Sequence, residues 1–187
     1  TRNQILSAMT VYGFLSYHDE ELTIPNKELR MKFSDALEDD SMGSISEIVS
    51  QSNQMLKATL NKDTQTMEKL LQEAHDINIP VIKYNDENSL ACVITLVYLS
   101  ARTKYKIIRE MPAGIGFADF IFYPNNKSKP AFIIELKKDS TPDEALKQIK
   151  EKRYALALKD YMGPKLAIGI SYDSKLKNHK VKIEEIN

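Results

Sequence analysis

The chain has 187 residues, a formal net charge of zero and a 42% share of hydrophobic residues. This length fits one domain or a small domain with an appendage, and the apolar fraction is sufficient for a globular core. The neutral charge balance excludes a globally basic surface, so any basic surface must be local. Cys92 is the single cysteine, which excludes a disulfide framework and fits a reducing cytoplasm, the location that we expect.

The sequence shows neither a signal peptide nor an apolar run long enough to span a bilayer, so we expect no membrane partner. The chain begins with Thr1 rather than methionine. We therefore expect it to be a piece of a longer protein.

The first part of the chain has a mainly helical pattern. Residues 5–11 have the pattern of the end of a helix, and two short strands are expected at 12–17 and 21–24. Asn26 is a candidate N-cap for a helix over residues 27–37. Helix, hairpin and helix together suggest a winged-helix-like appendage.

Two amphipathic helices are predicted next, over residues 44–60 and 64–77, because apolar positions recur at helical spacing. Pro80 marks the end of this helical part. We therefore expect a boundary near Asn78, between a mainly helical N-terminal segment (1–78) and a second domain (79–187).

The second domain alternates between helical and strand patterns. The expected order is helix 87–102, strand 105–111, strand 117–123, strand 131–138, helix 142–158, strand 165–171 and strand 179–185. Apolar and charged residues alternate in the last strand, which indicates a half-exposed edge. This order predicts an α/β fold with a mixed central sheet.

Three charges interrupt the two apolar strands in the middle of this domain: Asp119, Glu135 and Lys137. Side chains alternate along a strand, so Glu135 and Lys137 share one face, and all three groups meet if the two strands pair. Two adjacent carboxylates raise each other's pKa and favour a cation between them. Mg²⁺ commonly takes one or two carboxylates plus waters, and a neighbouring lysine can offset charge on a phosphate. The alternative is that this strand end emerges into solvent and that Asp119 closes a turn.

The order αβββαβ, with Asp119 on the second strand and the Glu135-Leu136-Lys137 run on the third, resembles the PD-(D/E)XK nuclease superfamily. This resemblance implies a restriction-endonuclease-like core. The runs ENSL (87–90), REMPAGIGFAD (109–119), IIELKK (133–138) and ALKQIKEKRY (145–154) resemble more closely the branch found C-terminal to AAA-ATPase-like domains in bacterial proteins. The IPNKEL run (24–29) resembles the segment that joins the two parts, so the resemblance implies an upstream ATPase domain as a partner.

The resemblance also implies site residues. Asp119 and Glu135 match the metal-binding acids, with the backbone carbonyl of Leu136 as a further ligand, and Lys137 matches the catalytic lysine. Glu87 matches the acid that completes the metal shell or orients a water. An ordinary first-turn acid that complements the helix dipole explains Glu87 as well.

Gln148 matches the glutamine of the helix after the lysine strand, although a solvated helix position is the alternative. Tyr154 matches its companion tyrosine, but it lies further from Gln148 than the Gln-x-x-x-Tyr pattern allows, which argues for a core position instead. A local phosphate-binding surface and a solvated amphipathic face explain the neighbouring basic residues equally well; these are Lys138, Lys147, Lys150, Lys152 and Arg153.

The resemblance therefore implies a nuclease that hydrolyses phosphodiester bonds of nucleic acid, DNA ahead of RNA, with Mg²⁺ as cofactor and Mn²⁺ as its substitute. The alternative is a catalytically silent module that uses the nuclease fold to bind nucleic acid or protein. The neutral net charge favours this alternative slightly.

Overall fold

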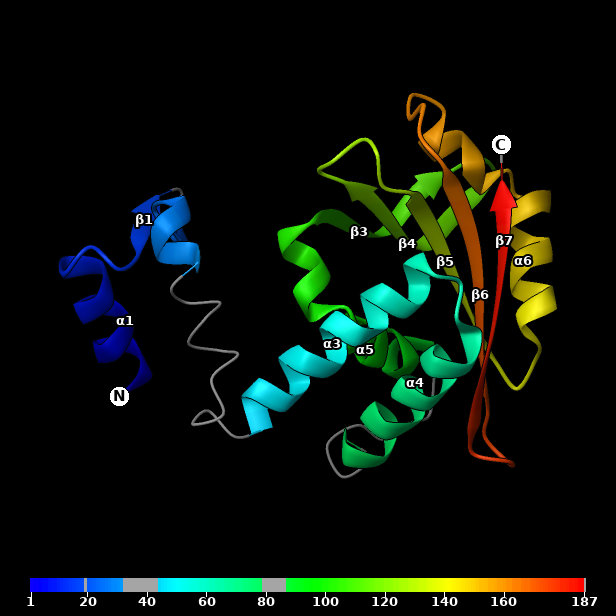
Figure 1. The fold of residues 1–187 in the computed structure, drawn as a ribbon, viewed down its shortest axis with the longest axis horizontal. Coiled ribbons are helices and arrows are strands. Elements are labelled where there is room, and N and C mark those ends of the chain that lie inside the picture. Colours follow the sequence, from blue (N-terminus) through cyan, green and yellow to red (C-terminus); the bar gives the residue numbers. More distant parts are fainter. Residues whose placement is uncertain (19, 32–43, 79–86, 187) are drawn as a thin grey trace. The chain divides into compact units, whose positions relative to one another are not determined.

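The computed structural model describes residues 1–18, 20–31, 44–78 and 87–186. The chain forms two compact units, Thr1–Ser50 and Gln51–Asn187 (Figure 1). Residues 32–37 of the expected helix 27–37 lie outside the described residues.

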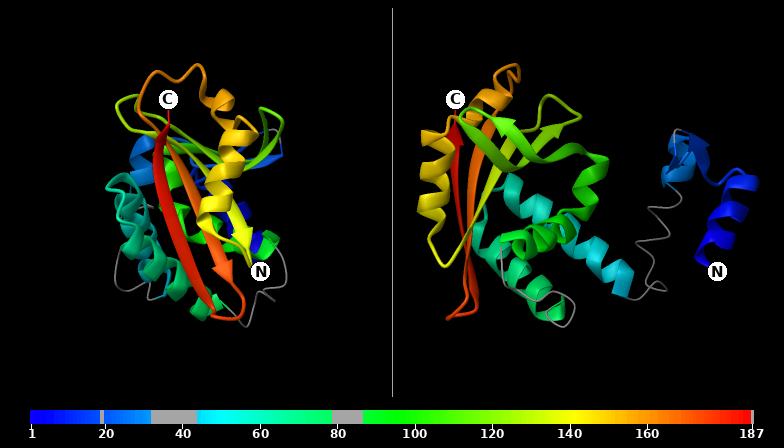
Figure 2. Two further views of the ribbon diagram at one scale, coloured as in Figure 1. Left: turned by 90° about the vertical axis from the view of Figure 1, so that its right-hand side faces the viewer. Right: turned by 180° about the vertical axis from the view of Figure 1, so that it is seen from behind.

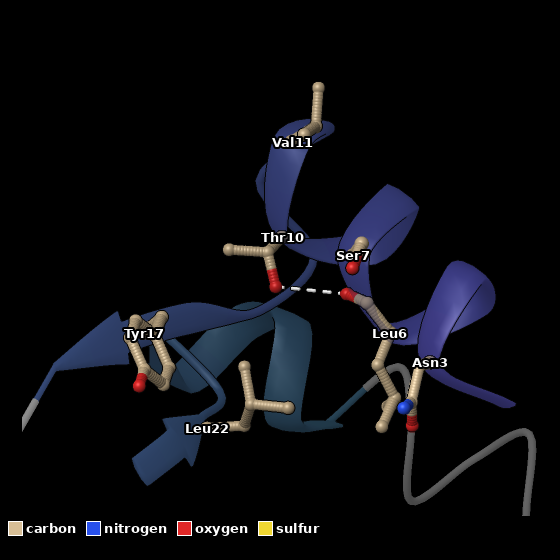
Figure 3. A pocket seen from close by; sticks show the side chains of 7 residues that line it. All are labelled: Asn3, Leu6, Ser7, Thr10, Val11, Tyr17 and Leu22. Carbon is tan, nitrogen blue, oxygen red and sulfur yellow. Dashed lines mark hydrogen bonds between the residues drawn. The ribbon is translucent and has the colours of Figure 1, made fainter. Parts of the chain in front are cut away.

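The N-terminal unit contains helix α1 (Arg2–Val11) and a hairpin of β1 (Ser16–His18) and β2 (Glu21–Thr23). The first strand starts later than expected because Gly13 adopts a left-handed conformation (φ 78°) in the turn that follows the helix. In Figure 3, Leu6 of α1 and Leu22 of β2 line one pocket, and Thr10 Oγ1 donates to the Leu6 carbonyl at 2.9 Å.

Asn26 caps the next helix, as predicted. Its side chain accepts the Leu29 backbone N–H at 2.8 Å, and its carbonyl accepts that of Arg30 at 3.1 Å. Residues 27–31 are helical. Helix, hairpin and helix thus follow in the expected order; the winged-helix likeness stays a prediction.

The second unit is built on a five-stranded sheet in the order β3-β4-β5-β6-β7. Its strands are β3 (Tyr105–Ala113), β4 (Gly116–Pro124), β5 (Ala131–Lys138), β6 (Lys165–Asp173) and β7 (Asn178–Ile186). Strands β5 and β6 pair in parallel and the other neighbours pair antiparallel. The mixed sheet predicted from the sequence is confirmed, with β7 at one edge.

The crossover between the parallel strands contains α6 (Pro142–Glu151) and a 3₁₀ helix, η3 (Tyr154–Leu158). Thr141 caps α6, since its side-chain oxygen accepts the Glu144 N–H at 3.2 Å. The expectation of one continuous helix over residues 142–158 is wrong. Arg153 adopts a left-handed conformation (φ 55°) that separates the two helices.

The sheet has a helical layer on each side, with α6 and η3 on one face (Figures 1 and 2). The other face is covered by the second half of α3 (Ser44–Leu60), α4 (Thr64–Asn78), α5 (Glu87–Val97) and η2 (Leu99–Thr103). We expected one helix over residues 87–102. The structure divides it into α5, which ends at Val97, and the 3₁₀ helix η2, which follows. A core around Phe120, Phe122 and Phe132 fills the space between these helices and the sheet.

Residues 51–78 therefore pack with the sheet, although the sequence led us to place them in the N-terminal segment. The division after Ser50 reflects how compactly the residues pack, whereas the boundary near Asn78 was placed where the sequence pattern changes. The boundary near Asn78 stays a prediction. No helix within the described ranges is long and apolar enough to cross a bilayer.

Candidate active site

The candidate site lies where the ladder between β4 and β5 ends. Phe120 and Ile134 are paired, and the next residues along the two strands are Asp119 and Glu135. The Asp119 carboxylate reaches across and accepts the Leu136 backbone N–H at 2.8 Å. A side chain thus replaces the backbone ladder at this point and holds the two strands in place.

Glu135 is the buried acid of the site. Only 2% of the residue is exposed, and its Oε1 accepts from Lys137 Nζ at 3.3 Å and from Gln148 Nε2. Burial, together with the charge of Asp119, raises its pKa to about 7, although Lys137 acts in the opposite direction. Within the part of the chain that the structure describes, its second oxygen, Oε2, accepts no hydrogen bond.

Lys137 lies two residues further along β5, on the same face as Glu135, as strand alternation predicts. Its side chain is 20% exposed, against 3% for that of Glu135. The ammonium group therefore lies between the buried carboxylate and solvent, where a charged ligand can reach it.

Gln148 comes from α6 and links this helix to the site. Its amide nitrogen donates to Glu135 and also to the Tyr154 hydroxyl at 3.1 Å. Tyr154 is 2% exposed, and burial raises the pKa of its phenol. Tyr154 is thus both the core residue that we predicted and a contact of Gln148.

The sequence spacing argued against a Gln148–Tyr154 pair, and the helix break explains why the two residues still meet. Because Arg153 is left-handed, the chain leaves the α-helical path just before Tyr154. The sequence indicated this pair only through a glutamine followed by a tyrosine near the end of a predicted helix. It gave no indication of where the helix would break.

The glycine turn between β3 and β4 packs on this same break. The Ile115 N–H donates to the Lys152 carbonyl at 2.8 Å. Gly114 has φ 53°, and a Cβ there would lie 2.7 Å from the Arg153 carbonyl oxygen and closer still to that of Lys152. A Cβ on Gly116 would lie 3.1 Å from the Tyr154 hydroxyl. The sequence alone gave no sign that Gly114 and Gly116 pack against this break.

Two predicted site residues remain to be placed. Glu87 begins α5, but its side chain lies outside the described residues, so its role at the site stays a prediction. Leu136 has a buried side chain on the opposite face from Glu135, and its backbone lies beside Asp119.

Several of the basic residues that we considered as a phosphate-binding surface have acidic neighbours. Lys150 pairs with Glu184 at 2.6 Å. Lys147 lies 3.9 Å from Glu144, and Lys138 lies 4.0 Å from Asp139. These pairs favour the solvated-face explanation for the three lysines.

A divalent cation fits the two acids. Glu135 Oε2 is a buried acceptor without a donor among the described residues, and the neighbouring Asp119 charge disfavours a second negative charge there. A cation would satisfy both conditions. No group of three or more carboxylate, imidazole or thiol side chains clusters as a metal site in the described ranges, so waters or the Leu136 carbonyl would have to complete the shell.

The fold and the site together define a class: a restriction-endonuclease-like α/β protein with an acid on β4 and an acid-x-lysine run on β5. Residues 85–182, just over half of the chain, match the family described as "PD-(D/E)XK nuclease superfamily". The chain belongs to this superfamily. Its members are generally phosphodiesterase nucleases, and they typically use divalent metal ions. No curated protein sequence matches the chain.

Proposed function

We propose that this chain is a nuclease that hydrolyses phosphodiester bonds of nucleic acid with Mg²⁺, which Mn²⁺ can replace. The observation that carries the proposal is the buried Glu135 carboxylate beside Asp119, with Lys137 on one oxygen and the other oxygen without a donor among the described residues. A carboxylate pair that only stabilised the fold would be expected to have its oxygens satisfied by hydrogen bonds.

Asp119, Glu135 and the Leu136 carbonyl would hold the metal ion. When bound, the ion supplies a Lewis acid and makes a water more acidic. Lys137, which is partly exposed, would offset the negative charge that develops on the phosphate. Gln148 would keep the Glu135 carboxylate in orientation through its amide. Glu87 stays a proposed further acid of this shell.

The proposal of DNA ahead of RNA depends on the superfamily, and a substrate comparison separates the two. Plasmid DNA, single-stranded DNA and RNA are each incubated with the full chain in Mg²⁺, in Mn²⁺ and in EDTA. We expect metal-dependent cleavage, fastest on DNA, and none in EDTA. Faster cleavage of RNA would reverse the substrate order.

The site is tested with Asp119→Asn, Glu135→Gln and Lys137→Met. Removing a group that stabilises transition-state charge typically costs about 10²–10³-fold in rate. Lys138→Met is the matched control, since Lys138 follows Lys137 in the same strand and alternates to the other face. Cleavage that survives Asp119→Asn or Lys137→Met at the unchanged rate would remove the catalytic proposal.

A catalytically silent binding module is the second candidate. The ion pairs of Lys147 and Lys150 favour it, because they reduce the basic surface available to a nucleic acid beside the site. Calorimetric titration with Mn²⁺ separates the two: binding that Glu135→Gln abolishes supports the nuclease, and no binding supports the module. In either case an upstream ATPase domain is the partner that we propose, and the cytoplasm is the location.

A further inference from the structure

A second cavity, of about 610 Å³, opens away from the carboxylate site. Its walls come from α3, the turn after α3, the end of η2, the start of β3 and the β4–β5 turn. Tyr105 pairs with Pro124 there, whereas the turn that packs near Tyr154 closes the other end of the β3–β4 ladder, at Ala113 and Gly116. The cavity is therefore separate from the site of Asp119 and Glu135.

The lining of this cavity is basic. Lys57, Lys104 and Lys129 contribute to it, and its described lining includes no carboxylate. All three lysines are exposed, and the described part of the chain offers their ammonium groups neither an ion pair nor a hydrogen bond. Elsewhere on this unit, lysines such as Lys150 and Lys180 are paired with acids. Three like charges around one cavity repel one another, and a bound anion would relieve that repulsion.

Amide side chains are the second feature of the lining. The cavity is bordered by Asn53, Asn61, Asn125 and Asn126. The Asn125 N–H donates to the Lys104 carbonyl at 2.9 Å, and its side-chain amide donates to the Thr103 carbonyl at 3.3 Å. The Lys129 N–H donates to the Asn126 carbonyl at 3.0 Å. These bonds fix the Asn125 side chain and the backbone that carries Lys104 and Lys129. Asparagine amides offer both donors and acceptors, which match the edges of nucleobases.

The third feature is an apolar floor. Leu56 and Tyr105 are each 3% exposed and lie beneath the polar rim with Leu60. An apolar floor with a few convergent polar groups is typical of small-ligand sites. The apolar floor suits the flat face of a base. The amides can bond to the edge of the base, and the ammonium groups can bind a phosphate.

We propose that this cavity binds a nucleoside phosphate, either as a free nucleotide or as one unit of a nucleic-acid strand. The phosphate lies among Lys57, Lys104 and Lys129, and the base lies over Leu56 and Tyr105. This binding requires no cleavage and no metal, so it does not depend on the proposed nuclease activity.

Calorimetry in EDTA tests the proposal on the full chain carrying Lys137→Met, which prevents cleavage during the measurement. The probes are adenosine monophosphate, adenosine, inorganic phosphate and a short single-stranded oligonucleotide. We expect the monophosphate to bind at least tenfold more tightly than adenosine or phosphate. If only the oligonucleotide binds, and its binding requires the three lysines, the cavity binds a nucleotide unit of a nucleic-acid strand rather than a free nucleotide.

The decisive variant is Lys57→Gln/Lys104→Gln/Lys129→Gln, which should weaken binding at least tenfold. Its matched control replaces three exposed lysines outside this lining, Lys159, Lys175 and Lys177, by glutamine and should bind as the parent does. Thermal unfolding of both variants checks that each is folded. The proposal is overturned if no probe binds, if phosphate alone binds as well as the monophosphate, or if the two triple variants bind equally. None of these results bears on cleavage, which is measured separately.

Discussion

The Asp119 carboxylate accepts the backbone N–H of Leu136 at 2.8 Å, one residue beyond the last paired residues of β4 and β5. The same carboxylate contributes to the raised pKa of Glu135. One side chain therefore both joins the strands and adds to the effect of burial, which is the larger cause of the raised pKa of Glu135. This dual role accounts for an acid in an otherwise apolar strand, where even partial burial of a charge is costly.

The metal-free protein should lose stability as the pH rises through the titration of Glu135. Its pKa is raised from 4.5 to about 7, chiefly by burial, so the folded state binds the proton more tightly than the unfolded chain. The contribution of Glu135 to stability is then largest below pH 4.5, and it falls by about 3 kcal/mol up to about pH 7. Urea unfolding in EDTA across this range measures the fall. Glu135→Gln should remove it, and an unchanged pH profile in that variant would contradict the assignment.

The same argument predicts that divalent cations stabilise the protein most at high pH. Above pH 7 the Glu135 carboxylate is ionised beside Asp119, so a cation can bind two negatively charged carboxylates. We expect Mn²⁺ to raise the melting temperature at pH 8 and to have little effect at pH 5. Asp119→Asn serves as the control, in which the rise at pH 8 should shrink. Equal shifts at both pH values would place the bound metal elsewhere.

Gly114→Ala should be strongly destabilising because the turn has no room for a Cβ. The residue has φ 53°, and the new atom would overlap the Lys152 carbonyl oxygen. Because the obstacle is backbone rather than a flexible side chain, we expect a loss of about 2–4 kcal/mol in the free energy of unfolding. Gly116→Ala is the control, since the three atoms nearest to its Cβ would all belong to the Tyr154 side chain, the closest being the hydroxyl at 3.1 Å. Comparable losses for both variants, measured by urea unfolding, would show that the turn can move.

The strands could be predicted from the sequence because they carry apolar and aromatic runs bounded by strong breakers. Ala131–Lys138 was predicted with its observed bounds, between Pro130 and the residues that lead to Pro142. Asp119 and Glu135 could be predicted as a pair for the same reason, since a carboxylate within such a run is conspicuous. Their contact required only that neighbouring strands pair.

The break between α6 and η3 could not be predicted, because Lys152 and Arg153 are good helix formers. Tertiary packing decides it: the Lys152 carbonyl accepts the Ile115 N–H from a turn nearly forty residues away in sequence. The packing of α3 and α4 on the sheet was missed for a related reason. An amphipathic face shows that a helix packs, but it does not show on what.

Gln148 and Tyr154 should act as a unit. The Gln148 amide donates to both Glu135 and the Tyr154 hydroxyl, so losing the hydroxyl frees the amide that orients the carboxylate. We expect Tyr154→Phe to slow cleavage by about 3–10-fold, the equivalent of one hydrogen bond. A double-mutant cycle with Gln148→Met should be non-additive, because the second change then removes a contact already weakened. Additive effects on rate would show that the two residues act separately.

A buried aromatic cluster between α4 and the sheet should make the protein sensitive to acid. The His179 ring lies 4.9 Å from that of Tyr172 and 5.2 Å from that of His75, and its Nδ1 lies 3.2 Å from Gln72 Oε1. Burial, followed by His75, lowers the pKa of His179 from 6.5 to about 3. The folded state thus binds this proton less tightly than the unfolded chain, so stability is lost as the pH falls from 6.5 towards 3.

This dependence is opposite in sign to that of Glu135, and the two partly cancel between pH 4.5 and 6.5. The variants separate them. His179→Phe removes the ionisable ring. It should therefore abolish the loss of stability towards low pH, which is of the order of 4 kcal/mol. The loss of stability with rising pH that Glu135 causes should remain. Urea unfolding from pH 3 to 8 measures both, with His18→Phe, an exposed histidine of the other unit, as the control. An acid loss that persists in His179→Phe would have to arise from another group.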